Sequence, residues 1–183
     1  MATLTLANQL TLVRLLLVPV LVILVIYGRS GWALITFILA GVTDGLDGII
    51  ARRSGGPTSL GALLDPMADK LLLVSTFVVL TLPSLDLANR FPIWLTVLVI
   101  SRDVIIVLTV AVVNLAVERF TFPPSHLGKV ATFVYILTGS VTLLFNYLDR
   151  PSLVVEAAIW ASLAVTLASG FHYIFHAARL VNR

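Results

Sequence analysis

Long apolar stretches are the feature that most limits how this chain can fold. Six of them follow one another through 183 residues, at about 8–27, 31–50, 60–82, 91–117, 127–148 and 152–178. Each approaches the roughly 20 apolar residues that an α-helix needs to cross a bilayer. Only 11% of the residues are charged, whereas about 25% is usual in soluble domains. The sequence therefore predicts an all-α fold, a polytopic membrane bundle of about six transmembrane helices.

Short breaks containing polar residues, glycine or proline separate the apolar stretches. None is long enough to divide the chain, so residues 1–183 are predicted to form a single membrane domain. With the N-terminus in the cytoplasm, eight basic residues lie at inner ends and three at outer ends of the stretches: Arg14, Arg52, Arg53, Lys70, Arg119, Lys129, Arg179 and Arg183 inside, and Arg29, Arg90 and Arg150 outside. The positive-inside rule then predicts a multi-pass protein of the cell (inner) membrane with both termini inside.

The basic residues do not indicate a nucleic-acid partner, although the sequence pI is about 9.7. The twelve lysines and arginines are scattered among apolar runs and form no continuous stripe that could follow a phosphate backbone. The chain has no cysteine, which excludes disulfides, thiolate catalysis and cysteine-based metal sites.

Four aspartates are concentrated at the facing ends of the second and third apolar stretches, although the chain has only nine acidic residues. Asp44 and Asp47 are spaced i, i+3, and Asp65 and Asp69 are spaced i, i+4, so each pair lies on one helical face. A carboxylate near hydrocarbon costs roughly 2.5–3.5 kcal/mol, and such residues usually serve function. Because like charges repel unless a cation separates them, and because oxygen ligands suit Mg²⁺ or Mn²⁺, we expect a site for two divalent metal ions.

The residues between the two aspartate pairs suit a nucleotide. Gly48 and Gly61 let a ligand approach the backbone closely, and Arg52 offers a planar guanidinium to phosphate oxygens. The turn at 54–59 is predicted on the cytoplasmic side, where a soluble nucleotide would enter. Carboxylates, metal ions, glycine and arginine together indicate phosphoryl-type transfer with the active site on the cytoplasmic side.

Residues 44–69 read DGLDGIIARRSGGPTSLGALLDPMAD and match the pattern D-x2-D-G-x2-A-R-x8-G-x3-D-x3-D. All eight specified positions agree, namely Asp44, Asp47, Gly48, Ala51, Arg52, Gly61, Asp65 and Asp69. The segment resembles the signature of the CDP-alcohol phosphatidyltransferase family. The predicted layout of six spans extends this resemblance loosely to the rest of the chain.

The resemblance implies an enzyme of phospholipid biosynthesis that transfers a phosphatidyl group from CDP-diacylglycerol to an alcohol acceptor and releases CMP. The implied roles are metal binding for Asp44, Asp47, Asp65 and Asp69, general-base catalysis for Asp69, and contact with the CDP moiety for Gly48, Arg52 and Gly61. It also implies a homodimer in the lipid bilayer.

Segments outside the signature bear on the acceptor. Residues 7–14, 64–70 and 128–132 resemble bacterial phosphatidylglycerophosphate synthases, whose acceptor is glycerol 3-phosphate. A dianionic acceptor needs basic partners inside the cavity, and Arg102 and Lys129 are the available candidates. Glycerol 3-phosphate is therefore the first expectation.

The fourth apolar stretch departs from the pattern of those synthases. They usually carry Arg-Glu there and a second arginine about two turns later, whereas this chain has Arg102-Asp103 followed by Val110 and Ala111. Ser101-Arg102-Asp103 also resembles the cardiolipin synthases of the same family, whose acceptor is phosphatidylglycerol. Phosphatidylglycerol is therefore the alternative acceptor.

Two other interpretations stay open at the level of the sequence. A divalent cation transporter would also explain intramembrane carboxylates, but not Gly48, Arg52 and Gly61 at fixed offsets. Arg102 and Asp103 could be structural, and we do not expect them to pair, because adjacent residues on a helix do not face each other.

Overall fold

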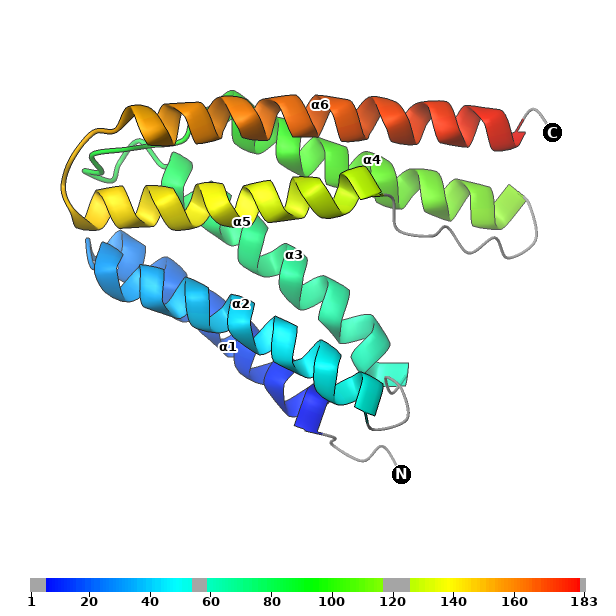
Figure 1. Cartoon of the computed structure of the whole chain (residues 1–183), viewed down its shortest axis with the longest axis horizontal. Helices are drawn as coiled ribbons and strands as arrows, with labels where there is room; N and C mark the ends of the chain where they lie inside the picture. Colours follow the sequence, from blue (N-terminus) through cyan, green and yellow to red (C-terminus); the bar gives the residue numbers. More distant parts are fainter. Residues whose placement is uncertain (1–5, 54–58, 117–125, 182–183) are drawn as a thin grey trace. The chain divides into compact units, whose positions relative to one another are not determined.

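The computed structural model describes residues 6–53, 59–116 and 126–181, with side chains described for 9–43, 67–109 and 127–173. Within these ranges the only regular elements are α-helices, and Figure 1 shows their order. They are α1 (Leu6–Ile26), α2 (Ser30–Arg53), α3 (Ser59–Thr81), α4 (Ile93–Ala116), α5 (His126–Tyr147) and α6 (Leu153–Val181). The predicted all-α fold is confirmed, and each helix begins and ends within three residues of a predicted apolar stretch.

Among the described side chains, polar groups are buried together with apolar ones, and many large apolar groups are exposed. Thr11, Arg14 and Thr76 are fully buried, whereas Leu16 is 68% and Leu153 is 80% exposed. Three segments of the described chain are long and apolar enough to cross a membrane, namely Gln9–Ile26, Leu127–Tyr147 and Leu153–Tyr173, and Ser30–Thr43 is a shorter apolar helix. Apolar exteriors around buried hydroxyl groups are what helices packed in lipid require, because water is absent outside.

The chain divides into two compact units that alternate along the sequence. The first unit comprises the described parts of residues 1–90 together with 139–151, and the second comprises 91–138 together with the described part of 152–183. The helix α5 contributes its first half to the second unit and its last turns to the first. A single membrane domain over residues 1–183 stays a prediction.

In the first unit, α1 packs against both α2 and α3, and α2 contacts α3. Leu21, Phe37 and Phe77 are buried in its core. Gly139 brings α5 close to this core, because a β-carbon at this position would lie 3.2 Å from Cζ of Phe37. α1 is terminated by Gly28, which has a left-handed φ of 68° and donates its N–H to the carbonyl of Val25 at 3.0 Å.

Two buried asparagines link the segment after α3 to the end of α5 by hydrogen bonds. The backbone N–H of Asn89 donates to Oδ1 of Asn146 at 2.7 Å, and Nδ2 of Asn146 donates to the carbonyl of Asn89 at 3.0 Å. Nδ2 of Asn89 also donates to the carbonyl of Arg150 at 2.8 Å. The segment that follows α3 therefore lies beside the end of α5 in the first unit.

Replacing Asn146 by leucine is expected to destabilise the protein. The change leaves the N–H and C=O of Asn89 without their side-chain partner in a buried position, and each such group costs about 1–3 kcal/mol. A lower thermal midpoint in detergent measures the loss. Tyr147→Phe serves as the control, because it changes an exposed neighbouring side chain and keeps both hydrogen bonds between Asn146 and Asn89. A leucine variant as stable as the parent would contradict this role.

In the second unit, α4 packs against α6, and hydroxyl groups join α5 to α6. Oγ1 of Thr138 and Oγ of Ser162 are 2.8 Å apart, and the ring of Trp94 on α4 lies 5.9 Å from that of Trp160 on α6. These contacts hold the three helices together.

Candidate active site

The predicted site residues of the signature lie on two helices that contact each other. Asp44 and Asp47 belong to the last three turns of α2, and Asp65 and Asp69 belong to the first three turns of α3. The helical backbone therefore gives both pairs the i, i+3 and i, i+4 geometry expected from the sequence. Six of the predicted site residues have side chains outside the described ones: Asp44, Asp47, Gly48, Arg52, Gly61 and Asp65. Their roles stay predictions.

Asp69 is the one signature aspartate whose side chain is described, and it pairs with an arginine of α1. Nη1 of Arg14 donates to Oδ1 of Asp69 at 2.6 Å, across 55 positions of sequence. The arginine side chain is fully buried, whereas 41% of the aspartate side chain is exposed. A buried guanidinium is stable only with an acceptor beside it, so the pair fixes α1 against α3. It also restrains the Asp69 carboxylate on one side.

Sequence reasoning missed this role of Arg14. The residue was assigned to the inner membrane boundary as a topological charge, but it lies nine residues into α1 and has no exposed surface. The signal in the sequence was an arginine within an apolar helix, which needs a carboxylate or carbonyl partner. The sequence alone does not indicate which of the four aspartates is the partner of Arg14.

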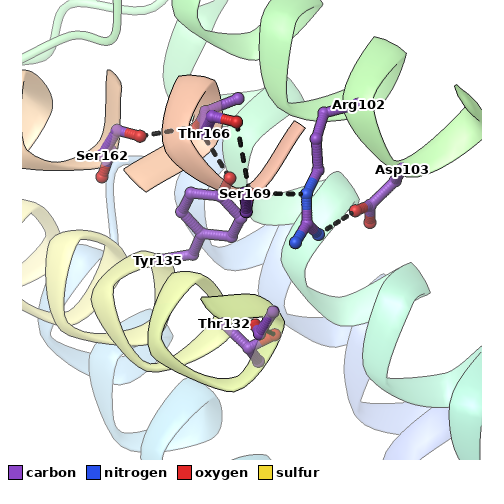
Figure 2. Close-up of polar contacts among 8 residues, drawn as sticks. Arg102, Asp103, Thr132, Tyr135, Ser162, Thr166 and Ser169 are labelled. Atoms are coloured by element: carbon purple, nitrogen blue, oxygen red, sulfur yellow. Dashed lines mark hydrogen bonds and ion pairs between the residues drawn. The ribbon is translucent and has the colours of Figure 1, made fainter. Parts of the chain in front are cut away.

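Arg102 lies in a polar network inside the second unit (Figure 2). Its Nε donates to Oγ of Ser169 on α6 at 3.0 Å, and Ser169 in turn donates to the carbonyl of Thr166 at 3.2 Å. Thr166 uses its only hydroxyl proton on the carbonyl of Ser162 at 2.6 Å. The hydroxyl of Tyr135 on α5, 2.7 Å from Oγ1 of Thr166, must therefore be the donor in that contact.

The expectation that Arg102 and Asp103 do not pair is wrong. Nη1 of Arg102 lies 2.7 Å from Oδ1 of Asp103, and their side chains are 10% and 21% exposed. Adjacent residues point in different directions at their Cβ atoms, but the long arginine side chain bends back far enough to reach the short carboxylate, as Figure 2 shows. The charge of Arg102 is thus balanced by a residue of its own helix.

Lys129, the other predicted acceptor residue, has a different environment. It is exposed in the first turn of α5, one turn before Thr132, whose hydroxyl donates to the carbonyl of Gly128 at 3.2 Å. Tyr135 follows six residues later, or about 9 Å further along the helix axis. Arg102 and Lys129 belong to the same unit, and their acceptor-binding role stays a prediction.

The described side chains contain no group of three or more histidine, aspartate or glutamate residues that could hold a metal ion. The side chains of three of the four predicted ligands are not among the described ones. This observation therefore does not test the two-ion site predicted from the sequence. The donor chemistry fits, because Asp69 offers a partly exposed carboxylate on the helix that also carries Asp65.

An α-helical membrane protein with aspartate pairs on two contacting helices is the class that this architecture defines. The chain belongs to the CDP-alcohol phosphatidyltransferase family, whose model matches residues 4–168. It is a phosphatidyltransferase of phospholipid biosynthesis, as the signature predicted, and the alternative of a cation transporter loses its basis.

Relatives with three different names are similar to this chain. It is 35% identical to the "Probable phosphatidylglycerophosphate synthase" of Mycobacterium tuberculosis (strain ATCC 25618 / H37Rv), over 95% of this chain and 82% of the relative. It is 31% identical to the "CDP-diacylglycerol--glycerol-3-phosphate 3-phosphatidyltransferase" of Bacillus subtilis (strain 168), over 92% of both chains. It is also 39% identical to the "Cardiolipin synthase (CMP-forming)" of Streptomyces coelicolor, over 71% of this chain and 60% of the relative.

Proposed function

We propose that this enzyme transfers the phosphatidyl group of CDP-diacylglycerol to glycerol 3-phosphate, in a metal-dependent reaction that forms phosphatidylglycerophosphate and releases CMP. The observation that carries the proposal is the contact between the buried Arg14 and the last aspartate of the signature, Asp69. A membrane protein seldom buries an arginine beside a partly exposed carboxylate unless that carboxylate must be held in position. Two relatives named for this reaction match nearly the whole chain.

In this proposal different signature residues bind the metal ions, bind the nucleotide and activate the acceptor. Asp44, Asp47, Asp65 and Asp69 would hold two Mg²⁺ or Mn²⁺ ions, and Gly48, Arg52 and Gly61 would border CDP. When bound, the ions supply positive charge that stabilises the charge developing on the transferred phosphoryl group and on CMP. The same carboxylates, at i, i+3 and i, i+4 spacing, provide the all-oxygen ligands that these ions prefer.

Asp69 would act as the general base. Its carboxylate takes the proton from the acceptor hydroxyl, and the oxygen of that hydroxyl attacks the phosphorus that bears diacylglycerol. The new phosphorus–oxygen bond forms as the bond to CMP breaks, and CMP leaves with the electron pair. Arg14 donates to Oδ1 of this carboxylate and so holds it in position on α3, where 41% of the aspartate side chain is exposed.

Arg102 and Lys129 would bind the phosphate of glycerol 3-phosphate. Two N–H groups of Arg102 are used by Ser169 and Asp103, and a guanidinium has five, so further donors remain for a phosphate. Lys129 would add a second positive charge from α5. Charge-assisted hydrogen bonds of this kind recognise phosphate more strongly than neutral ones.

Replacing Arg102 by glutamine tests the acceptor site. We expect KM for glycerol 3-phosphate to rise about 10–100-fold with little change in kcat, because one charge-assisted interaction contributes about 1.5–3 kcal/mol. Ser169→Ala is the matched control, since it removes the hydrogen bond to Arg102 and keeps the charge. If both variants lower the thermal midpoint equally and leave KM unchanged, Arg102 is structural.

Cardiolipin synthesis is the second candidate function. The sequence Ser101-Arg102-Asp103 and the 39% identity to a relative named cardiolipin synthase favour it. Phosphatidylglycerol would then replace glycerol 3-phosphate as acceptor, and its single negative charge needs less basic charge in the cavity. The charge balance of Arg102 by Asp103 is compatible with such an acceptor.

The deciding experiment measures CMP release by the purified protein in detergent. CDP-diacylglycerol and Mn²⁺ or Mg²⁺ are supplied with glycerol 3-phosphate, phosphatidylglycerol, inositol phosphate or serine, one at a time. Release only with glycerol 3-phosphate supports the first proposal, and release only with phosphatidylglycerol supports the second. Activity that persists at full rate in excess chelator contradicts metal dependence.

The same proposal covers how the protein assembles and how it is oriented in the membrane. The protein would be a homodimer in the cell (inner) membrane with the signature helices opening to the cytoplasm, where CDP-linked substrates are available. Cross-linking in intact membranes and accessibility labelling of a cysteine introduced near residue 55 test these two statements, because the chain has no cysteine of its own.

A further inference from the structure

A pocket of about 590 Å³ lies at the end of the first unit where α1 turns into α2 and where α5 ends. Its lining residues are Gly28, Arg29, Ser30, Gly31, Trp32, Leu34, Ile35, Leu144, Asn146 and Tyr147. All of them belong to the first unit. Arg14 is twelve residues before the end of α1, which is about 18 Å along the helix axis. The pocket is therefore separate from the Arg14–Asp69 pair.

The first turn of α2 presents backbone donors to this pocket. The N–H of Ala33 donates to the carbonyl of Arg29 at 3.0 Å, which closes the first turn. The N–H groups of Ser30, Gly31 and Trp32 precede this bond, and none makes a hydrogen bond within the described part of the chain. Free amides at the start of a long helix, together with the helix dipole, attract an anion.

Ser30 gives independent evidence that a polar ligand belongs there. Its side chain lines the pocket and the residue is only 6% exposed, yet its hydroxyl has no hydrogen-bond partner among the described residues. Because its oxygen is not among the fully enclosed polar atoms of the described side chains, the hydroxyl remains accessible and can bond to a ligand oxygen in the pocket. Arg29 beside it is exposed and adds a positive charge.

Apart from the buried Asn146, much of the remaining lining is apolar or aromatic and exposed. Trp32 is 65% and Tyr147 is 63% exposed, and Leu144 lies next to them at 40%. Gly31 permits this arrangement, because a β-carbon there would be 2.6 Å from Cδ2 of Tyr147. Aromatic rings next to an arginine are typical of the boundary between lipid and water.

We propose that this pocket binds an anionic phospholipid. The amides of the first turn of α2, the hydroxyl of Ser30 and the guanidinium of Arg29 bind the phosphate of the head group. The acyl chains lie along the exposed apolar surface that begins at Trp32 and Leu144. A soluble phosphate would use the donors and leave this apolar wall without a contact, so the observations favour a lipid.

The test uses Trp32 as the reporter. In the full chain carrying Trp94→Phe and Trp160→Phe, Trp32 is the only tryptophan, because the sequence has three. The detergent-solubilised protein is titrated with phosphatidylglycerol or phosphatidylcholine brominated on the acyl chains. We expect half-maximal quenching by phosphatidylglycerol at a concentration lower by about fivefold or more than that of phosphatidylcholine. Equal quenching by both lipids overturns the proposal.

Two pocket variants, one control variant and one competitor test which groups bind the lipid. Arg29→Gln is expected to remove the preference for the anionic lipid, and Gly31→Ala is expected to weaken it by displacing the ring of Tyr147. Arg150→Gln, which changes an arginine outside the pocket lining, should keep the preference, and all three should keep CMP release. Loss of the preference in Arg150→Gln, or its retention in Arg29→Gln, overturns the assignment. Inorganic phosphate that displaces the brominated lipid would show a site for soluble phosphate instead.

Discussion

Replacing Asp69 by asparagine is expected to reduce kcat for CMP release by about 10²–10⁴-fold, which is the usual contribution of a general base. Asparagine has nearly the same shape, and its Oδ1 can still accept the hydrogen bond from Arg14. The amide cannot take the proton of the acceptor hydroxyl, and it is a weaker ligand for a divalent ion. CMP release under saturating substrates measures the effect.

The thermal midpoint separates this loss from unfolding. Asparagine keeps an acceptor for Arg14 but leaves the buried guanidinium without a countercharge, so the thermal midpoint should fall, and kcat is compared at a temperature at which both proteins are fully folded. Asp86→Asn is the matched control, because Asp86 is exposed in the segment between α3 and α4. A folded Asp69→Asn protein with parental kcat and metal dependence would disprove the base assignment.

Replacing Arg14 by methionine is expected to lower kcat by about 10²-fold while KM for the acceptor stays nearly unchanged. Methionine fills similar space but removes the donor to Asp69, so the carboxylate can turn away from the productive geometry. A displacement of about 1 Å at a catalytic group is enough for a loss of this size. Arg14→Lys should recover part of kcat, since a single ammonium can still reach one carboxylate oxygen.

A purely structural role for Arg14 predicts a different outcome. The methionine variant would then have a lower thermal midpoint, but its folded fraction would turn over at the parental rate and lysine would give no kinetic rescue. The double variant Arg14→Met, Asp69→Asn is informative here. If Arg14 acts through Asp69, the double variant is no slower than Asp69→Asn alone, because the two residues work as a unit.

The sequence was sufficient to predict the helices, because lipid removes most of the ambiguity in a hydrophobic pattern. A segment such as residues 152–178 has to be a helix in a bilayer, since no other isolated structure satisfies its backbone there. The division into two units was not predictable. It depends on side-chain fit at positions such as Gly139, where the absence of a β-carbon lets α5 approach Phe37.

The site residues that follow one another at short intervals could be predicted from the sequence. The contacts between residues far apart in the sequence could not. The aspartate pairs were found because the i, i+3 and i, i+4 intervals and the family signature lie within one segment of the sequence. The partner of Asp69 was missed because Arg14 lies 55 residues away. Arg102 was identified as a candidate, but its contact with Ser169 crosses 67 positions and could not be inferred from spacing.

The burial of Arg14 also has a consequence for how the chain is made. During synthesis, α1 leaves the ribosome well before Asp69 does, so its arginine enters the membrane without that carboxylate. An arginine near the centre of a helix costs roughly 2.5–3.5 kcal/mol on insertion scales, and a lone α1 has only its apolar side chains to offset this cost. The ion pair with Asp69 stabilises α1 only after α3 has entered the membrane, so a nascent chain that stops between the two helices lacks this contact.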